Sequence, residues 1–399
     1  MSKERQFAAA LAIVLAGAGT MACGAKGDEY VIGVAGPIEK PNGRSLKMAA
    51  EMAVKEINDA GGVDGHPLRL QIEDDGGDAA KAIEAAARLR ANPAVLAVIG
   101  HVNSGATLNA APVYNGDFDE TDAAGGDSTA QAGRAELKGT HPLVEISPAS
   151  SGIDITHAGD WTFRSVPTDL DHGPVLARQV GQTLGRQRAA ILYTNDDYGR
   201  GVMTSFGDAF RRSGRQVVES DPYVPAMIAG SDGLSPYLAR AIRNGADAIV
   251  IAGQVDGATR IIGQARAMGF TGPILGGDGL TSLKDSAGGD GLYISSAWLP
   301  DRADPAAQEF VRKYFDTYHE YPDHRGANGY DLVYLLAAAI KDGGASRQQI
   351  RDYLAGVGTR RPAFIGRATG KIAFDANGDA LGREVTVGVV RQRKLVTAR

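Results

Sequence analysis

The sequence predicts an α/β protein built of two doubly wound lobes, each a parallel sheet covered by helices on both faces. Its 399 residues exceed what one hydrophobic core usually holds. Short β-rich runs alternate with stretches of helical periodicity, and this alternation occurs in two separate series. Strand–helix alternation over short loops is typical of parallel sheets, whose strands are connected by crossover helices.

The composition is that of an ordinary globular protein. Hydrophobic residues make up 43% of the chain and charged residues 22%, so extensive disorder is not expected. The formal net charge of −5 gives no electrostatic basis for binding nucleic acid. We therefore expect no nucleic-acid partner.

Residues 1–22 are typical of a secretory signal peptide. Lys3 and Arg5 precede an apolar stretch at 7–15, which is short for a membrane span, and small residues follow. Cys23, the only cysteine, excludes an internal disulfide. Its position resembles the lipid acceptor of a bacterial lipoprotein; ordinary cleavage between small residues is the alternative. We expect an exported protein, either lipid-anchored on the outer face of the cell membrane or periplasmic.

The first series of elements predicts the first lobe. We expect strands at 31–35, 68–72, 95–100 and 143–147, with helices at 46–58 and 79–89. Between 115 and 140 the apolar periodicity stops and acidic residues gather without the spacing of a calcium loop. We interpret this segment as a solvated surface insertion and assign it no role.

The second series predicts the second lobe. We expect strands at 189–193, 248–252, 273–276 and 292–297, and helices at 201–213, 236–244 and 258–268. A further helical pair at 305–318 and 328–341 adds to one of the two lobes.

No catalytic or metal-binding motif supports an enzyme. The chain has no Gly-x-Ser-x-Gly elbow, Walker loop or cysteine nucleophile. His319 and His324 are five residues apart instead of the four of a zinc helix, and Pro322 interrupts the turn between them. We expect surface histidines, no metal and no cofactor; a hydrolase on an α/β scaffold is the alternative that turnover would reveal.

The first lobe offers hydroxyl groups where ligands bind in doubly wound sheets, beyond the carboxyl ends of the strands. The run 95–100 leads to Ser104 and Thr107, and the run 143–147 leads to Ala149 and Ser151. Hydroxyls and backbone N–H groups at a helix start suit an anion such as a carboxylate.

The second lobe offers an aromatic ring and an acid at the equivalent positions. The run 189–193 leads to Tyr198, and the run 273–276 leads to Asp278 on a glycine turn. The acid in the second lobe would bind a cation, and the donors in the first lobe would bind an anion. A protein with both groups facing each other is suited to binding a zwitterion. Each residue also has a plainer interpretation: Ser104 and Ser151 as helix N-caps, Asp278 as a turn residue and Tyr198 as core.

Seven motifs occur in the order found in one family: 32–37, 56–65, 73–75, 98–101 with Ser104, 147–151, 197–199 and 277–279. With them, residues 30–390 resemble the substrate-binding proteins of branched-chain amino acid ABC transporters, which have the class I periplasmic-binding fold. The resemblance implies two lobes joined by three crossover strands near 166–168, 296–297 and 365–366. Lobe one would comprise 29–167 and 297–365, with the insertion 115–140, and lobe two 168–296 and 366–399.

The resemblance also implies a function. A monomeric, exported binding protein would capture an amino acid or related small polar ligand by lobe closure and deliver it to an ABC permease. The alternatives are a sensory ligand-binding module, or a binder of amides, urea or aromatic acids on the same fold. A neighbouring permease gene or the co-purified ligand would separate them.

The roles of single residues follow from the same resemblance. Ser104, Ala149 and Ser151 match positions that hold the α-carboxylate, with Thr107 in the same loop; Asp278 matches the acid that takes the α-ammonium, and Tyr198 the ring that closes the cleft. Asp169, beside the first crossover, would join the polar network. Asn42 and Gln254 stand where relatives that bind leucine-like ligands often have aromatic rings. A polar ligand side chain is therefore expected over leucine.

Overall fold

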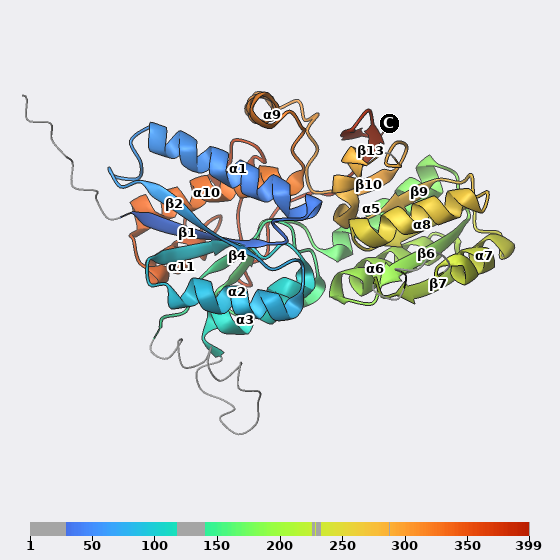
Figure 1. Ribbon diagram of the computed structural model, residues 1–399, viewed down its shortest axis with the longest axis horizontal. Helices are drawn as coiled ribbons and strands as arrows, with labels where there is room; N and C mark the ends of the chain where they lie inside the picture. Colours follow the sequence, from blue (N-terminus) through green and yellow to red (C-terminus); the bar gives the residue numbers. More distant parts are fainter. Residues whose placement is uncertain (1–28, 118–139, 226–227, 229–232, 287, 399) are drawn as a thin grey trace, which may run out of the picture.

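The computed structural model describes residues 29–117, 140–225, 228, 233–286 and 288–398 (Figure 1). The predicted signal peptide, Cys23 and most of the insertion 115–140 lie outside these residues. In the described part of the chain, no helix is long and apolar enough to cross a membrane.

Two α/β lobes lie side by side, as Figure 1 shows. The sheet of the first lobe has five parallel strands in the order β2-β1-β3-β4-β5. These strands are β1 (Tyr30–Gly36), β2 (Leu68–Asp74), β3 (Val95–Ile99), β4 (Glu145–Ser147) and β5 (Thr162–Arg164). Their apolar side chains fill two cores, one on each face of the sheet, as expected for strands buried on both sides.

Helices cover both faces of this sheet. On one face α2 and α3 enclose a core of small side chains such as Ala82, Ala86 and Ala110. On the other face α1, α9, α10 and α11 pack around Leu46, Phe310 and Leu336. The bounds are α1 (Pro41–Asp59), α2 (Ala79–Ala91), α3 (Ser104–Asn115), α9 (Pro305–Tyr318), α10 (His324–Gly343) and α11 (Arg347–Leu354). The later helical pair therefore belongs to the first lobe.

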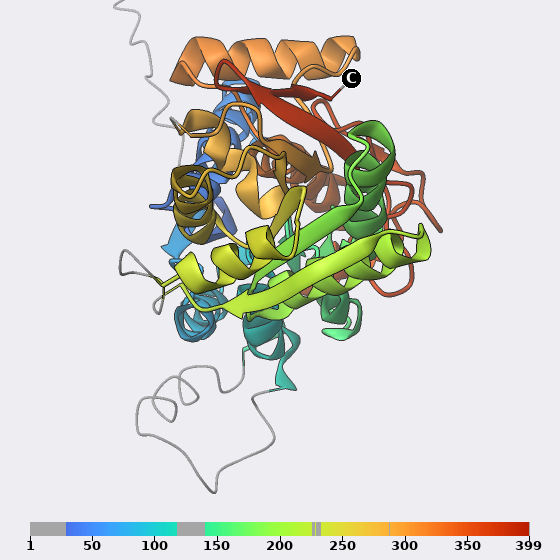
Figure 2. The same cartoon turned by 90° about the vertical axis from the view of Figure 1, so that its right-hand side faces the viewer.

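The second lobe, turned toward the viewer in Figure 2, has seven strands in the order β14-β13-β10-β9-β8-β6-β7. The first five in chain order are parallel: β6 (Arg188–Thr194), β7 (Gln216–Tyr223), β8 (Ala248–Ala252), β9 (Ile274–Gly276) and β10 (Tyr293–Ser296). At one edge β13 (Thr386–Arg391) and β14 (Lys394–Thr397) add antiparallel. A separate hairpin pairs β11 (Phe364–Ile365) with β12 (Lys371–Ile372).

Helices also cover both faces of the second sheet. The core on one face contains residues of α5 (Asp169–Arg178) and α6 (Asp197–Arg212), and the core on the other contains residues of α7 (Ser235–Arg243) and α8 (Val255–Ala267). The short helices are η2 (Ile153–His157), η3 (Gln179–Thr183) and η4 (Asp278–Asp285). The predicted fold class, two doubly wound lobes, is confirmed.

The chain passes between the lobes three times. It leaves the first sheet after β5 and enters the second core with α5. It returns after β10, because Trp298 lies in the core of the first lobe. Ile372 and Phe374 lie in that same core, so the third passage falls between Phe374 and β13, later in the chain than the predicted position at 365–366.

Candidate functional site

The part of the site in the first lobe lies at the carboxyl ends of β3 and β4. Ser104 begins α3, and its Oγ accepts a hydrogen bond of 3.0 Å from the N–H of Gly152. The hydroxyls of Thr107 and Ser150 are 2.8 Å apart. These contacts hold the loop 148–152, which contains Ala149 and Ser151, against the start of α3. The predicted first-lobe residues are thus brought together, and all four are buried.

Ser151 and Asp169 connect the two lobes at the first passage of the chain. The N–H of Asp169 donates to the carbonyl of Ser151 at 2.8 Å. Within the described residues, the Ser151 Oγ and both carboxylate oxygens of Asp169 have no hydrogen-bond partner. Burial raises the pKa of the Asp169 carboxyl well above its ordinary value, and the nearby Asp278 raises it further. Asp169 is therefore a buried acid that forms no ion pair with the residues the structure describes.

Tyr198 and Asp278 form the part of the site in the second lobe. The Tyr198 hydroxyl accepts a hydrogen bond of 2.9 Å from the N–H of Gly279. A Cβ on Gly277 would lie 2.3 Å from that hydroxyl, so glycine permits this close approach. Asp278 is 2% exposed, and its Oδ2 has no hydrogen-bond partner among the residues that the structure describes. Burial and the neighbouring Asp278 raise the pKa of Tyr198.

Two histidines join this cluster, and the sequence reasoning did not find them as site residues. The Nε2 atoms of His172, from α5, and of His324, from α10, each lie 3.8 Å from Asp278 Oδ2. Both imidazoles are fully buried, so the prediction that His324 is a surface histidine is wrong, whereas His319 is exposed. The sequence does contain one signal for His324. Asp323 is a residue type that favours the N-cap position, and it predicts a helix that begins at His324.

Asn42 and Gln254 lie apart from this inner cluster, in a separate hollow between the lobes that we call the mouth of the cleft. They line a hollow of about 190 Å³ whose walls come from both lobes, including Gly76 and Asn103 from the first and Asp196 and Asp256 from the second. Within the described part of the chain, Gln254 Oε1 has no hydrogen-bond partner. The wall of this hollow includes the polar side chains of Asn42, Asn103 and Gln254.

Contacts between η4 and the start of α10 hold the lobes together beside the cluster. Arg325 donates from Nη2 to the carbonyl of Asp278 at 3.1 Å and from Nη1 to the Thr281 Oγ1 at 2.6 Å. Asp323 accepts from both Arg325, at 2.9 Å, and Thr281, at 3.1 Å. All four residues are buried. Arg325 and Asp323 form an ion pair within the first lobe, and their hydrogen bonds to Asp278 and Thr281 orient the segment of the second lobe that carries Asp278.

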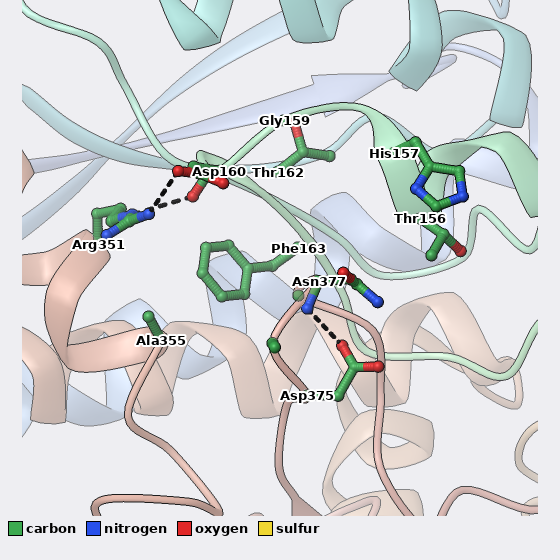
Figure 3. A pocket seen from close by; sticks show the side chains of 12 residues that line it. Thr156, His157, Gly159, Asp160, Thr162, Phe163, Arg351, Ala355, Asp375 and Asn377 are labelled. Atoms are coloured by element: carbon green, nitrogen blue, oxygen red, sulfur yellow. Dashed lines mark hydrogen bonds and ion pairs between the residues drawn. The ribbon is translucent and has the colours of Figure 1, made fainter.

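A second hollow, of about 280 Å³, lies on the first lobe between β5 and α11 (Figure 3). Its charged groups pair with one another: Arg351 contacts Asp160 at 3.3 Å, and Asp375 accepts from the N–H of Asn377 at 2.9 Å. This hollow offers a ligand fewer unpaired groups than the inter-lobe cluster. Among the described residues, no group of three or more His, Cys, Asp or Glu could hold a metal ion.

The inter-lobe cluster is suited to binding a small polar molecule. It offers hydroxyls and a helix start from one lobe, and two acids and a ring from the other, with imidazoles between them. Buried polar atoms without partners favour a ligand that supplies hydrogen-bond donors and positive charge.

Comparisons with known proteins agree with this arrangement. The model of a family described as periplasmic binding protein matches residues 30–394. A Leu/Ile/Val-binding protein homologue of Brucella abortus is 27% identical over 80% of each chain. Two solved structures have a TM-score of 0.76: a branched-chain amino acid transporter substrate-binding protein of Streptococcus pneumoniae with isoleucine, 25% identical, and a leucine-binding protein of Thermotoga maritima, 26% identical. Each alignment covers 92% of this chain and 97% of the solved one.

Proposed function

Because the chain belongs to the periplasmic binding protein family, we propose that it captures an amino acid between its lobes and delivers it to an ABC permease. The relatives support this function, since their names describe Leu/Ile/Val binding and branched-chain amino acid transport. The observation that carries the proposal is Asp278, a buried carboxylate with no hydrogen-bond partner for Oδ2 among the described residues. Asp169, between the lobes, is near both Asp278 and Ser151.

The roles of the site residues follow from their positions. The start of α3 and the loop 148–152 would receive the α-carboxylate, with Ser104, Thr107, Ala149 and Ser151 around it. Backbone N–H groups at a helix start favour an anion there. Asp278, with Asp169 nearby, would receive the α-ammonium, and Tyr198 would hold the Asp278 turn in place through Gly279.

The polar mouth favours a ligand with a polar side chain. Asn42 and Gln254 provide amide groups, which can donate and accept hydrogen bonds. An aliphatic side chain placed there would leave these amides unpaired, which costs about 1–3 kcal/mol for each buried group. We therefore expect leucine to bind more weakly than amino acids with amide or hydroxyl side chains.

Export and anchoring are part of the proposal. The signal-like residues 1–22 and Cys23 support an exported protein, tied to the outer face of the membrane by acyl chains on Cys23. A Cys23→Ala variant should then move from the membrane fraction to the soluble fraction. Equal membrane content in the two proteins would contradict lipid anchoring.

A thermal-shift screen tests the binding function. Ligands of the folded state raise the melting temperature, by an amount that grows with concentration over Kd. The screen contains the twenty L-amino acids, their amides, urea and benzoate. We expect amino acids with polar side chains to give the largest shifts. Shifts from benzoate or urea alone would support another ligand class, and loss of uptake of the bound amino acid after gene deletion would test delivery.

A further inference from the structure

Two imidazoles flank Asp278 without bonding to it directly. The Nε2 atoms of His172 and His324 are each 3.8 Å from Oδ2 of Asp278, which is too long for a hydrogen bond. Both imidazoles are fully buried. His172 comes from the second lobe and His324 from the first, so the three side chains meet across the cleft.

The surroundings of His172 allow a lone pair on Nε2. Its Nδ1 lies 2.9 Å from the Oγ of the buried Ser295 on β10. When Nδ1–H donates to that oxygen, Nε2 is an acceptor that faces Asp278. Across the residues described, this Nε2 has no hydrogen-bond partner.

His324 is also neutral near pH 7. Burial, and next the positive Arg325, lower its pKa to about 4. Neither of its ring nitrogens has a hydrogen-bond partner in the described chain. A neutral imidazole offers one acceptor nitrogen, and Nε2 is the nitrogen that lies near Asp278.

We propose that His172, His324 and Asp278 form a three-acceptor site for the primary ammonium group of the ligand. This inference rests on the proposed function and specifies which ligands the site accepts. An ammonium group has three N–H donors, one for each acceptor atom, whereas an N-methylated amine has fewer and a hydroxyl only one. A nitrogen placed between Asp278 Oδ2 and either Nε2, which are 3.8 Å apart, can reach a hydrogen-bond distance of about 2.9 Å from both atoms.

The charges around the site agree with a cationic ligand group. Next to the imidazoles, Arg325 is paired with Asp323, and Lys284 with Asp285. Of the remaining titratable groups, Asp278 from η4 faces both imidazoles, and Asp169 from α5 and Tyr198 from α6 lie near Asp278. Asp169 and Asp278 thus have no guanidinium or ammonium partner in the described chain.

Binding is therefore linked to protonation. In an open cleft the solvated imidazole of His324 would titrate near pH 6.5. An ammonium beside it requires this imidazole to be neutral, so the complex binds fewer protons than the free protein. Affinity then rises with pH, and protons are released on binding. The expected dependence lies between about pH 6.5 and the lowered pKa of His324, about 4.

The test uses His172→Phe and His324→Phe, with His157→Phe as the control, because His157 is exposed and lines the hollow of Figure 3 instead. Each protein is screened by thermal shift against the twenty L-amino acids. The amino acid with the largest shift is titrated calorimetrically from pH 5 to 8, beside its N-methyl and α-hydroxy analogues. Circular dichroism checks folding.

We expect wild-type affinity to rise about tenfold or more between pH 5 and 7.5, with proton release measured in two buffers. Each cleft variant should bind about tenfold or more weakly, His324→Phe should also lose much of the pH dependence, and the control should match the wild type. Replacing His324 with Gln, whose amide oxygen also accepts, should restore part of the affinity. If His172→Phe does not fold, Ser295→Ala tests the same imidazole. This variant removes the hydroxyl beside Nδ1, so the proton is no longer held on Nδ1, and we expect weaker binding.

Two results would overturn the inference while leaving the proposed function intact. One is an amino acid that binds wild type and both phenylalanine variants equally at every pH. The other is an N-methyl or α-hydroxy analogue that binds as well as the parent amino acid. A wild-type protein that no amino acid stabilises would instead overturn the proposed function itself.

Discussion

Replacing Asp278 with Asn is the sharpest test of the site. Asn has nearly the same size as Asp, so the variant removes the charge and keeps the shape of a side chain that is 2% exposed. An ammonium at about 4 Å from the carboxylate gains about 4 kcal/mol at an effective dielectric constant near 20, before desolvation. Removing one partner of a buried charge pair costs about 2–5 kcal/mol. The affinity for the amino acid should therefore fall about 30-fold to several thousand-fold.

Isothermal titration calorimetry measures this change, and Asp256→Asn is the matched control. Asp256 is an exposed carboxylate at the mouth of the cleft, so its loss should leave the affinity nearly unchanged. Without a ligand, Asp278→Asn should melt at the same or a higher temperature, because an uncompensated buried charge destabilises the fold. Unchanged affinity in Asp278→Asn would refute the ammonium assignment. An equal loss of affinity in Asp278→Asn and Asp256→Asn would indicate that the carboxylates attract the ligand at long range and that Asp278 makes no direct contact with it.

Three further predictions follow from the hydrogen bonds and the mouth of the site. Tyr198→Phe leaves the N–H of Gly279 without its acceptor and should lower the free energy of unfolding by about 1–3 kcal/mol; an unchanged urea midpoint would contradict this. Gln254→Leu should shift the preference toward aliphatic amino acids in competition calorimetry, and an unchanged preference would remove Gln254 from the specificity wall. Arg325→Met removes the hydrogen bonds to Asp278 and Thr281, so the amino acid should dissociate faster in stopped-flow measurements, and equal rates would show that this contact does not hold the lobes together.

The sequence predicts the buried strands of this fold well and its edges poorly. The run 248–252 coincides with β8, because a strand buried on both faces is a continuous apolar run. β7, Gln216–Tyr223, was not predicted: it is a sheet edge with polar, partly exposed side chains. β5 has only three residues, and its buried Arg164 is stabilised by an ion pair with Asp379, a partner distant in the sequence.

The same limit applies to the site. Ser104, Ser151, Tyr198 and Asp278 could be predicted because each follows a strand, and the ends of parallel strands share one edge. His172 and His324 lie instead at the starts of helices, and they approach Asp278 only through the packing of one lobe against the other. No local periodicity encodes that packing. The helical pattern indicated a start at 328, whereas Asp323 caps α10 and places His324 in its first turn.

The polar atoms that we propose as ligand contacts also oppose closure without the ligand. Ser151 Oγ, Asp278 Oδ2 and His172 Nε2 are buried without hydrogen-bond partners among the described residues. Each such group costs about 1–3 kcal/mol, whereas water would satisfy it in an open cleft. The three groups together cost about 3–9 kcal/mol. This range includes the roughly 5.5 kcal/mol needed to move the equilibrium between the open and closed forms from 1:99 to 99:1. A ligand that bonds to these atoms removes that cost, so the chemistry that selects the amino acid also makes closure depend on it.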